Sequence, residues 1–390
     1  MIRLVLTSDN HLNRYYAKMT REQLRLRRRR IREAWKKTVD YAIEHRVNFY
    51  LHGGDLFDSP DPNPGELAFV AREFQRLREA NIPVLCISGN HDMPRAAGES
   101  ATPVRIYDEL KAARVFLSRT EVEFATFQID GMRIAIGGLA PDPRAGSDAD
   151  PLDGVRVEAP EADVRVLLLH CGVEDAVPPD FDNALLHKQR IADLKEVDYF
   201  LCGDIHKSSK HSIAHATVII PGATERMTFG EQSDTPGFYY LEFDGKRLSK
   251  AIHHTIEPQP MDRFEIRTTN LPGATPTEYV LEELSAKSRR EQLLQMRMGG
   301  PLPRDTYHAL RWFDIWSVGN ERNFFFDLDR AGVQLRSSDD QSVHASEERV
   351  STTRELELVA DEMAAGAESN EDRDILESAR ELVLSRYKQN

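Results

Sequence analysis

Short apolar runs that stop at polar residues recur along the first half of the chain. Five such runs, at 1–7, 47–51, 84–87, 164–169 and 199–201, have the length and residue types of buried β-strands. Between the first three runs, apolar residues recur at helical spacing over about 20–45 and 65–80, and Thr20 is a suitable N-cap for the first helix. Strands that alternate with helices predict an α/β fold with a parallel sheet.

More β structure is predicted further along this region. Segments 121–129 and 132–137 are expected to form a hairpin through Asp130 and Gly131, a residue pair typical of two-residue hairpin turns. Residues 141–163 are rich in Asp, Pro and Gly and are interpreted as a surface loop. Three further β segments are expected at 211–220, 237–243 and 248–255.

The sequence Pro-Gln-Pro at 258–260 is interpreted as a domain boundary, because the pattern of strands and polar clusters changes there. Beyond it, strands are predicted at 264–268, 291–298 and 323–328, with helices at 276–290 and 304–318. This β-α-β-α-β unit is interpreted as a smaller second domain at 258–338. The tail at 339–390 is expected to be a polar linker with two helices, near 346–365 and 371–388, that pack on their own domain or await a partner.

Charge is unevenly distributed along this chain of 390 residues, whose formal net charge is −13. Residues 21–37 hold nine basic residues against Glu22 and Glu33, a net charge of +7, whereas 339–390 holds fourteen acidic against six basic residues, a net charge of −8. The overall acidity argues against a general polyanion binder, although the distribution of charge matters more than its sum.

Length and cysteine usage limit the setting of the protein. No apolar run reaches the roughly 18 residues of a membrane span, and no signal segment precedes the first strand-like run. The three cysteines, Cys86, Cys171 and Cys202, are too few and wrongly spaced for a zinc ribbon or a disulfide framework. They are interpreted as small buried residues beside strand ends, and a reducing, cytoplasmic setting is expected.

Each of the five apolar runs ends in residues that can ligate a metal. These residues are Asp9 and His11, then Asp55, then Asn90 with His91 and Asp92, then His170, and finally Asp204 and His206. One such cluster is an ordinary turn or a buried histidine, but five at the same end of successive strands indicate a site for two metal ions. Mixed carboxylate, imidazole and amide ligands suit Mn²⁺, Fe²⁺ or Zn²⁺ better than Ca²⁺.

The clusters, in this order, resemble those of the calcineurin-like metallophosphoesterases. The sequences PGATERMTFG at 221–230 and PGF at 236–238 narrow the resemblance to the SbcD-type DNA-repair nucleases. The resemblance covers about 1–255 by motif and 258–338 by layout. It implies an α/β/β/α sandwich in a nuclease domain at 1–257, a small α/β capping domain, and tail helices that grip the coiled coil of an SbcC-type ATPase.

The same resemblance implies roles for individual residues. Asp9, His11, Asp55 and His206 would hold the first metal, and Asp55, Asn90, His170 and Asp204 the second, with Asp55 bridging. His91 would be the general acid, oriented by Asp92. The family usually has His where this chain has Asp204. Aspartate can ligate Mn²⁺ through oxygen and weaken its Lewis acidity, or it no longer ligates and one metal is weakly held.

The consecutive arginines Arg27, Arg28, Arg29 and Arg30 admit two interpretations. Consecutive residues point all around a helix, so they cannot form a single face. They are either the solvated start of the first helix or contacts to DNA phosphates, which arginine and lysine commonly bind.

The function expected from these features is that of a Mn²⁺-dependent DNA nuclease, with Fe²⁺, Mg²⁺ or Zn²⁺ as alternative metals. By resemblance it would be a 3′-to-5′ exonuclease on double-stranded DNA and an endonuclease on single strands, acting as a homodimer with an SbcC-type ATPase. Two alternatives stay open: a phosphoesterase for small phosphodiesters or monoesters, and a DNA-bound scaffold whose catalysis is impaired by Asp204.

Overall fold

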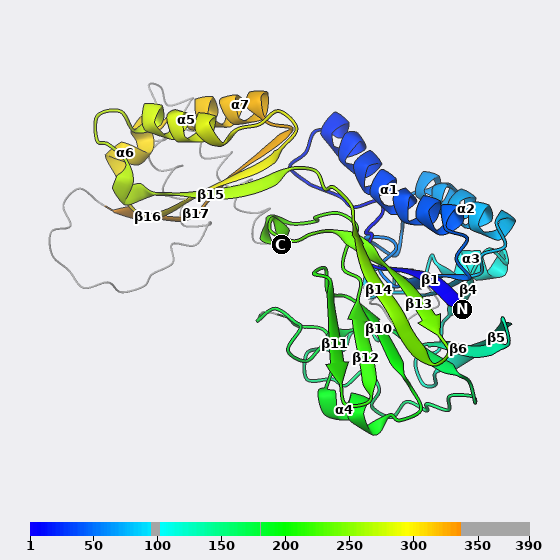
Figure 1. Ribbon diagram of the computed structural model, residues 1–390. Helices are drawn as coiled ribbons and strands as arrows, with labels where there is room; N and C mark the ends of the chain where they lie inside the picture. Colours follow the sequence, from blue (N-terminus) through cyan, green and yellow to red (C-terminus); the bar gives the residue numbers. More distant parts are fainter. Residues whose placement is uncertain (95–101, 180, 337–390) are drawn as a thin grey trace, which may run out of the picture. The chain divides into compact units, whose positions relative to one another are not determined.

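The computed structural model describes residues 1–94, 102–179 and 181–336 (Figure 1). Its first six-stranded sheet has the strand order β14-β13-β1-β2-β3-β4. The strands are β1 (Ile2–Thr7), β2 (Phe49–Gly53), β3 (Val84–Ile87), β4 (Arg114–Phe116), β13 (Gly237–Asp244) and β14 (Arg247–Thr255). Because β1 to β4 run parallel, their carboxyl ends lie at the same edge of the sheet.

A second six-stranded sheet has the order β11-β12-β10-β7-β6-β5. The strands are β5 (Glu123–Ile129), β6 (Met132–Gly138), β7 (Val164–His170), β10 (Tyr199–Gly203), β11 (Ser209–Ile213) and β12 (Ala216–Ile220). The predicted hairpin is confirmed: β5 and β6 pair through Asp130 and Gly131, whose φ angles of 49° and 80° match a two-residue turn. Parallel pairing of β7 and β10 again brings two strand ends together.

Two long helices, α1 (Arg21–Glu44) and α2 (Pro64–Glu79), cover the outer face of the first sheet (Figure 1). Both lie within one residue of their predicted ranges. Thr20 caps α1 in a capping box with Gln23, and Asn63 caps α2 through its side chain. These caps supply partners for backbone N–H groups that have none inside a helix.

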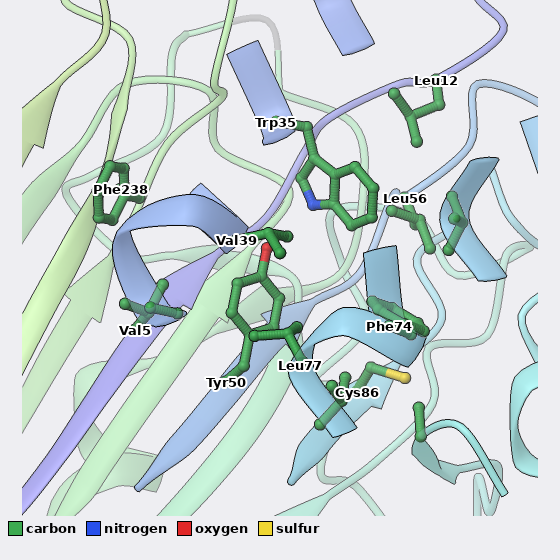
Figure 2. Packing of buried hydrophobic residues seen from close by; sticks show 14 of the residues in the cluster. Val5, Leu12, Trp35, Val39, Tyr50, Leu56, Phe74, Leu77, Cys86 and Phe238 are labelled. Carbon is green, nitrogen blue, oxygen red and sulfur yellow. The ribbon is translucent and has the colours of Figure 1, made fainter. Parts of the chain in front are cut away.

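Alternation along the strands separates two apolar cores. Val5 and Tyr50 pack with Trp35 of α1 in the core beneath the helices, as Figure 2 shows. The neighbouring strand residues Leu4 and Leu51 pack in the core between the two sheets. A third core covers the far face of the second sheet and includes the short helix α4 (Lys188–Asp193). The expected α/β/β/α sandwich is therefore confirmed.

The residues after 258–260 form a three-stranded sheet with the order β15-β16-β17 and an apolar core of their own. Its elements are β15 (Met261–Arg267), α5 (Pro276–Lys287), β16 (Leu293–Pro303), α6 (Arg304–Ala309), α7 (Trp312–Arg322) and β17 (Phe325–Arg336). The prediction of a single helix at 304–318 is wrong. This segment forms two helices, because Leu310 is extended and its side chain is buried.

Several short elements have no counterpart in the sequence prediction, among them α3 (Arg105–Glu109), β8 (Gly172–Val173) and β9 (Leu185–Leu186). The helices expected in the tail, near 346–365 and 371–388, lie outside the described residues, and the domain boundaries at 257 and 338 stay predictions. Within the described ranges, every helix is too short or too polar to cross a membrane.

Candidate dinuclear metal centre

The predicted ligands come together at the carboxyl ends of the strands. Asp9 and His11 follow β1, Asp55 follows β2, Asn90 follows β3, His170 ends β7, and Asp204 and His206 follow β10. The backbone N–H of Asp9 donates to the Gly54 carbonyl at 3.0 Å, which joins the first two loops. Nδ1 of His170 lies 2.8 Å from the Gly53 carbonyl oxygen, which links the two sheets.

The backbone of the site is unusual at four of these residues. Asp9, His11, Asp55 and Asp204 have φ angles of 52°, 47°, 54° and 84°, in the left-handed region that side chains disfavour. Such conformations cost about 1–3 kcal/mol each and cluster at functional sites. The loop after β3 approaches closely because residue 89 is glycine: a Cβ at Gly89 would collide with the Asp55 carboxylate.

One group of potential ligands consists of Asp9, His11 and His206, whose donor atoms all lie within 4.8 Å of one another. The Nε2 atoms of His11 and His206 are only 3.0 Å apart. Burial lowers the pKa of His11, which favours the neutral imidazole that a metal requires.

A second group consists of Asp9, Asp55 and His170. Nε2 of His170 lies 3.1 Å from Oδ1 of Asn90 and 3.8 Å from Oδ1 of Asp204. Asn90 and Asp204 therefore both lie near Nε2 of His170, the nitrogen that also faces Asp55.

The Oδ2 atom of Asp55 lies between the two groups. It is 3.7 Å from Nε2 of His11 and 3.4 Å from Nε2 of His170. A carboxylate in this position has the placement expected of a bridge between two metal ions.

The donor set fits a pair of divalent cations. Asp9 and Asp55 are 0% and 2% exposed, and buried carboxylates need a compensating cation. Burial raises the pKa of Asp204 to about 6, against the lowering effect of His170. Burial also raises the pKa of Asp55, but the imidazoles of His170 and His11 outweigh it and hold that pKa below its usual value. Two ions could be held here by nitrogen and oxygen ligands of the kind that Mn²⁺, Fe²⁺ and Zn²⁺ accept.

The predicted general acid, His91, is exposed beside the buried ligands. Its Nδ1 lies 3.2 Å from the Asp58 carbonyl oxygen, and its ring packs edge-on against that of His11, with centroids 4.9 Å apart. With Nδ1 engaged by the backbone, Nε2 is the nitrogen left to serve a substrate.

The expectation that Asp92 orients the imidazole of His91 needs correction. The Asp92 carboxylate is fully buried and accepts hydrogen bonds from the backbone N–H groups of Gly89, Leu56 and Phe57, at 3.0, 3.1 and 2.8 Å. It thus fixes the loops after β2 and β3 to each other, while the Asp58 carbonyl orients the ring.

Two carboxylates that were given no role from the sequence support the histidines. Oδ1 of Asp58 lies 3.2 Å from Nδ1 of His11, and Oε1 of Glu231 lies 3.1 Å from Nδ1 of His206. A carboxylate that is hydrogen-bonded to Nδ1, as Glu231 is to His206, fixes the tautomer and orientation of an imidazole that ligates a metal, and Asp58 lies at ion-pair distance from His11. Asp58 is the last residue of a Gly-Asp-x-x-Asp pattern at 54–58, and Glu231 directly follows the 221–230 stretch, so both had a weak signal in the sequence.

The four consecutive arginines have different environments. Arg27 is fully buried, 3.3 Å from Glu225, so the expectation that it contacts DNA is wrong in this structure. Arg28 donates to the carbonyl oxygens of Asn13 and Arg14, each at 2.9 Å. Arg29 and Arg30 are partly exposed and pair with Glu33 and Glu291, respectively. The side chains of Arg29 and Arg30 are 63% and 38% exposed.

Comparisons with known proteins agree with this geometry. A family model described as calcineurin-like phosphoesterase matches residues 2–208. The DNA double-strand break repair protein Mre11 of Methanocaldococcus jannaschii is 29% identical over 266 residues, which are 66% of this chain and 67% of that protein. Mre11 of Saccharolobus solfataricus is 26% identical over 279 residues, 70% of this chain and 68% of that protein.

A bacterial relative, the uncharacterized metallophosphoesterase YhaO of Bacillus subtilis, is 30% identical over 254 residues, 65% of this chain and 59% of that protein. The matched range 2–208 contains the strands β1, β2, β3, β7 and β10 and all seven expected metal ligands. The chain therefore belongs to the calcineurin-like phosphoesterase family of metal-dependent hydrolases.

Proposed function

We propose that the protein is a metal-dependent DNA phosphodiesterase, the nuclease subunit of a double-strand-break repair complex. The observation that carries the proposal is the position of the Asp55 carboxylate between two groups of buried ligands, 3.7 Å from His11 and 3.4 Å from His170. The similarity to two proteins named as double-strand-break repair Mre11 supports DNA as the substrate.

The residues of the chain divide the chemistry between them. Two divalent ions held by the centre would bind a phosphate, activate a water molecule and offset the charge that develops at phosphorus. Asn90 positions the phosphate beside His170. His91, anchored through Nδ1 to the Asp58 carbonyl, uses Nε2 to protonate the departing sugar oxygen.

The finer features of the proposal come from the resemblance. The expected metal is Mn²⁺, with Fe²⁺, Mg²⁺ and Zn²⁺ as alternatives. The expected activities are a 3′-to-5′ exonuclease on double-stranded DNA and an endonuclease on single strands. The expected assembly is a homodimer bound to an SbcC-type ATPase through the tail at 339–390.

A cleavage assay with end-labelled duplex and single-stranded DNA tests the proposal. The parent protein should cut both substrates when Mn²⁺ is added and neither when the metal is chelated. His91→Ala should bind Mn²⁺ and DNA like the parent but lose cleavage, whereas His187→Ala, at an exposed histidine of the α4 N-cap, should cut normally.

Two results would count against this function. Absence of metal-dependent cleavage on both DNA substrates, together with turnover of a small phosphodiester, would identify the protein as a phosphoesterase for small molecules. Full cleavage by His91→Ala would remove the imidazole from the reaction.

A further inference from the structure

Asn183 contacts the carboxylate of Asp204 directly. Its Nδ2 atom lies 3.0 Å from Oδ1 and 3.2 Å from Oδ2, so one amide group faces both oxygens. The reverse orientation of the amide would set its oxygen against two carboxylate oxygens, which accept hydrogen bonds and do not donate them. The amide NH2 group of Asn183, and not its oxygen, therefore faces the Asp204 carboxylate.

The Asp204 carboxylate has both acidic and imidazole neighbours. The Asp204 backbone N–H donates to Oδ1 of Asp9 at 3.0 Å, which brings two acidic residues together. Oδ1 of Asp204 also lies 3.8 Å from Nε2 of His170. The Asp9 and Asp55 carboxylates repel that of Asp204 and the His170 imidazole attracts it, and Asn183 adds a fixed donor beside both carboxylate oxygens.

Asn183 is itself held by the 141–163 loop and by the segment that follows His170. Residue 183 forms a β-bridge with Gly146, and the next carbonyl, that of Ala184, accepts the N–H of Gly172 at 2.9 Å. Strands β8 and β9 pair immediately afterwards. One small sheet thus sets the position of Asn183 relative to His170.

We infer that Asn183 is a positioning residue that presents Asp204 as an oxygen ligand of the second metal ion. Each carboxylate oxygen has two lone pairs, so a donor on one side leaves the other free for a metal. A neutral amide also leaves the negative charge of Asp204 available, whereas a lysine or arginine in its place would compete with the cation. The inference rests on the proposed function for its two metal ions.

Calorimetric titration of the metal-free protein with Mn²⁺, in the absence of DNA, tests this role. The parent should bind two ions, and Asn183→Ala should weaken one of them by about 10- to 100-fold, the usual effect of removing the partner of a ligand. The control is Asp182→Ala, which alters an exposed neighbour in the same loop and should bind both ions normally.

A double-mutant cycle separates positioning from a general effect on the loop. If Asn183 acts through Asp204, adding Asn183→Ala to Asp204→Ala should weaken Mn²⁺ binding no further. Additive losses, unchanged affinity in Asn183→Ala, or a parent that binds a single ion would each overturn the inference. If Asn183→Ala fails to fold, Asn183→Leu makes the same test, because it keeps the approximate size of the side chain, removes the donor and adds no charge.

Metal binding and DNA cleavage are measured separately, so the two proposals can fail separately. A protein that binds two ions in the expected cycle but cuts no DNA would contradict the proposed function and leave the role of Asn183 standing.

Discussion

Nδ1 of His206 lies 3.1 Å from Oε1 of Glu231, and this carboxylate is in turn fixed by two donors. The backbone N–H of Met227 donates to Oε2 at 2.7 Å, and the Thr228 hydroxyl donates to Oε1 at 2.9 Å. The stretch at 221–230 therefore does more than connect two strands: it holds the group that orients His206, an expected metal ligand after β10.

Replacing Glu231 with Gln should weaken the binding of Mn²⁺ by about 10- to 100-fold. The change keeps the size of the side chain but removes the negative charge that makes the His206 imidazole a stronger electron-pair donor to a metal ion. Calorimetric titration measures the affinity, with Glu257→Gln, at an exposed position, as the matched control. Equal affinities for the two variants would show that Glu231 has no such role.

The same pair should make the stability of the metal-free protein depend on pH. Burial lowers the pKa of His206, but Glu231, Asp9 and Asp55 outweigh it and raise the pKa from 6.5 to about 9. A pKa that is raised by folding gives stability that is complete below pH 6.5 and is lost as the pH rises through 9. In the presence of a chelator, the midpoint of thermal unfolding should therefore fall over this range.

Circular dichroism at several pH values measures this fall. Glu231→Gln should show a smaller one, because the largest favourable charge beside His206 is gone while Asp9 and Asp55 stay. Comparing the two proteins cancels the titration of other groups. Parallel curves for the parent and the variant would contradict the prediction.

Removing the buried cation Arg27 should destabilise the fold strongly. Arg27→Met leaves the Glu225 carboxylate, 3% exposed, without its partner at 3.3 Å. Breaking a buried pair in this way costs about 3–5 kcal/mol of unfolding free energy. Arg29→Met breaks an exposed pair with Glu33 on the same helix, which is worth about 0.5 kcal/mol or less. Urea unfolding of both variants compares them, and similar losses would refute the difference.

The position of Arg27 was accessible to sequence reasoning through its spacing. Arg27, Ile31 and Trp35 follow one another at intervals of four residues, so they lie on one face of α1, and all three are buried. The charge of the arginine run predicts contacts with DNA or solvent, whereas the helical spacing places Arg27 with the apolar residues Ile31 and Trp35.

The main elements and the gathering of the candidate metal ligands could be predicted because both follow from local patterns. When an apolar run stops at Asp, Asn or His, the polar residue marks the end of the buried strand. Parallel pairing then brings the ends of such strands together. The five strands follow from this pattern, and the helices α1 and α2 follow from apolar residues at helical spacing. Short elements such as β8 and β9 span two residues each, too few for any periodicity to appear.

The residues that hydrogen-bond to the candidate ligands could not be predicted, because tertiary structure brings them into contact. Asn183 precedes Asp204 by 21 residues in an irregular loop, and Glu231 follows His206 by 25. Neither spacing has a regular structural meaning. The helix break at Leu310 has a similar origin, since the apolar core of the smaller unit takes that side chain.

Arg29 and Arg30 are the arginines of the run that we still expect to contact DNA phosphates. Their side chains are 63% and 38% exposed, so both can exchange their surface ion pairs for phosphates. Replacing both with Ala should lower the affinity for duplex DNA and flatten its dependence on salt, by about 0.9 in the slope of log K against log salt for each lost phosphate contact. Fluorescence anisotropy of labelled duplex, with the metal chelated to prevent cleavage, measures both quantities.

Arg144→Ala, at a 62% exposed arginine of the 141–163 loop, serves as the control for charge alone. If the slope of the double variant equals that of the parent, the start of α1 does not bind DNA and the contact surface must be sought elsewhere.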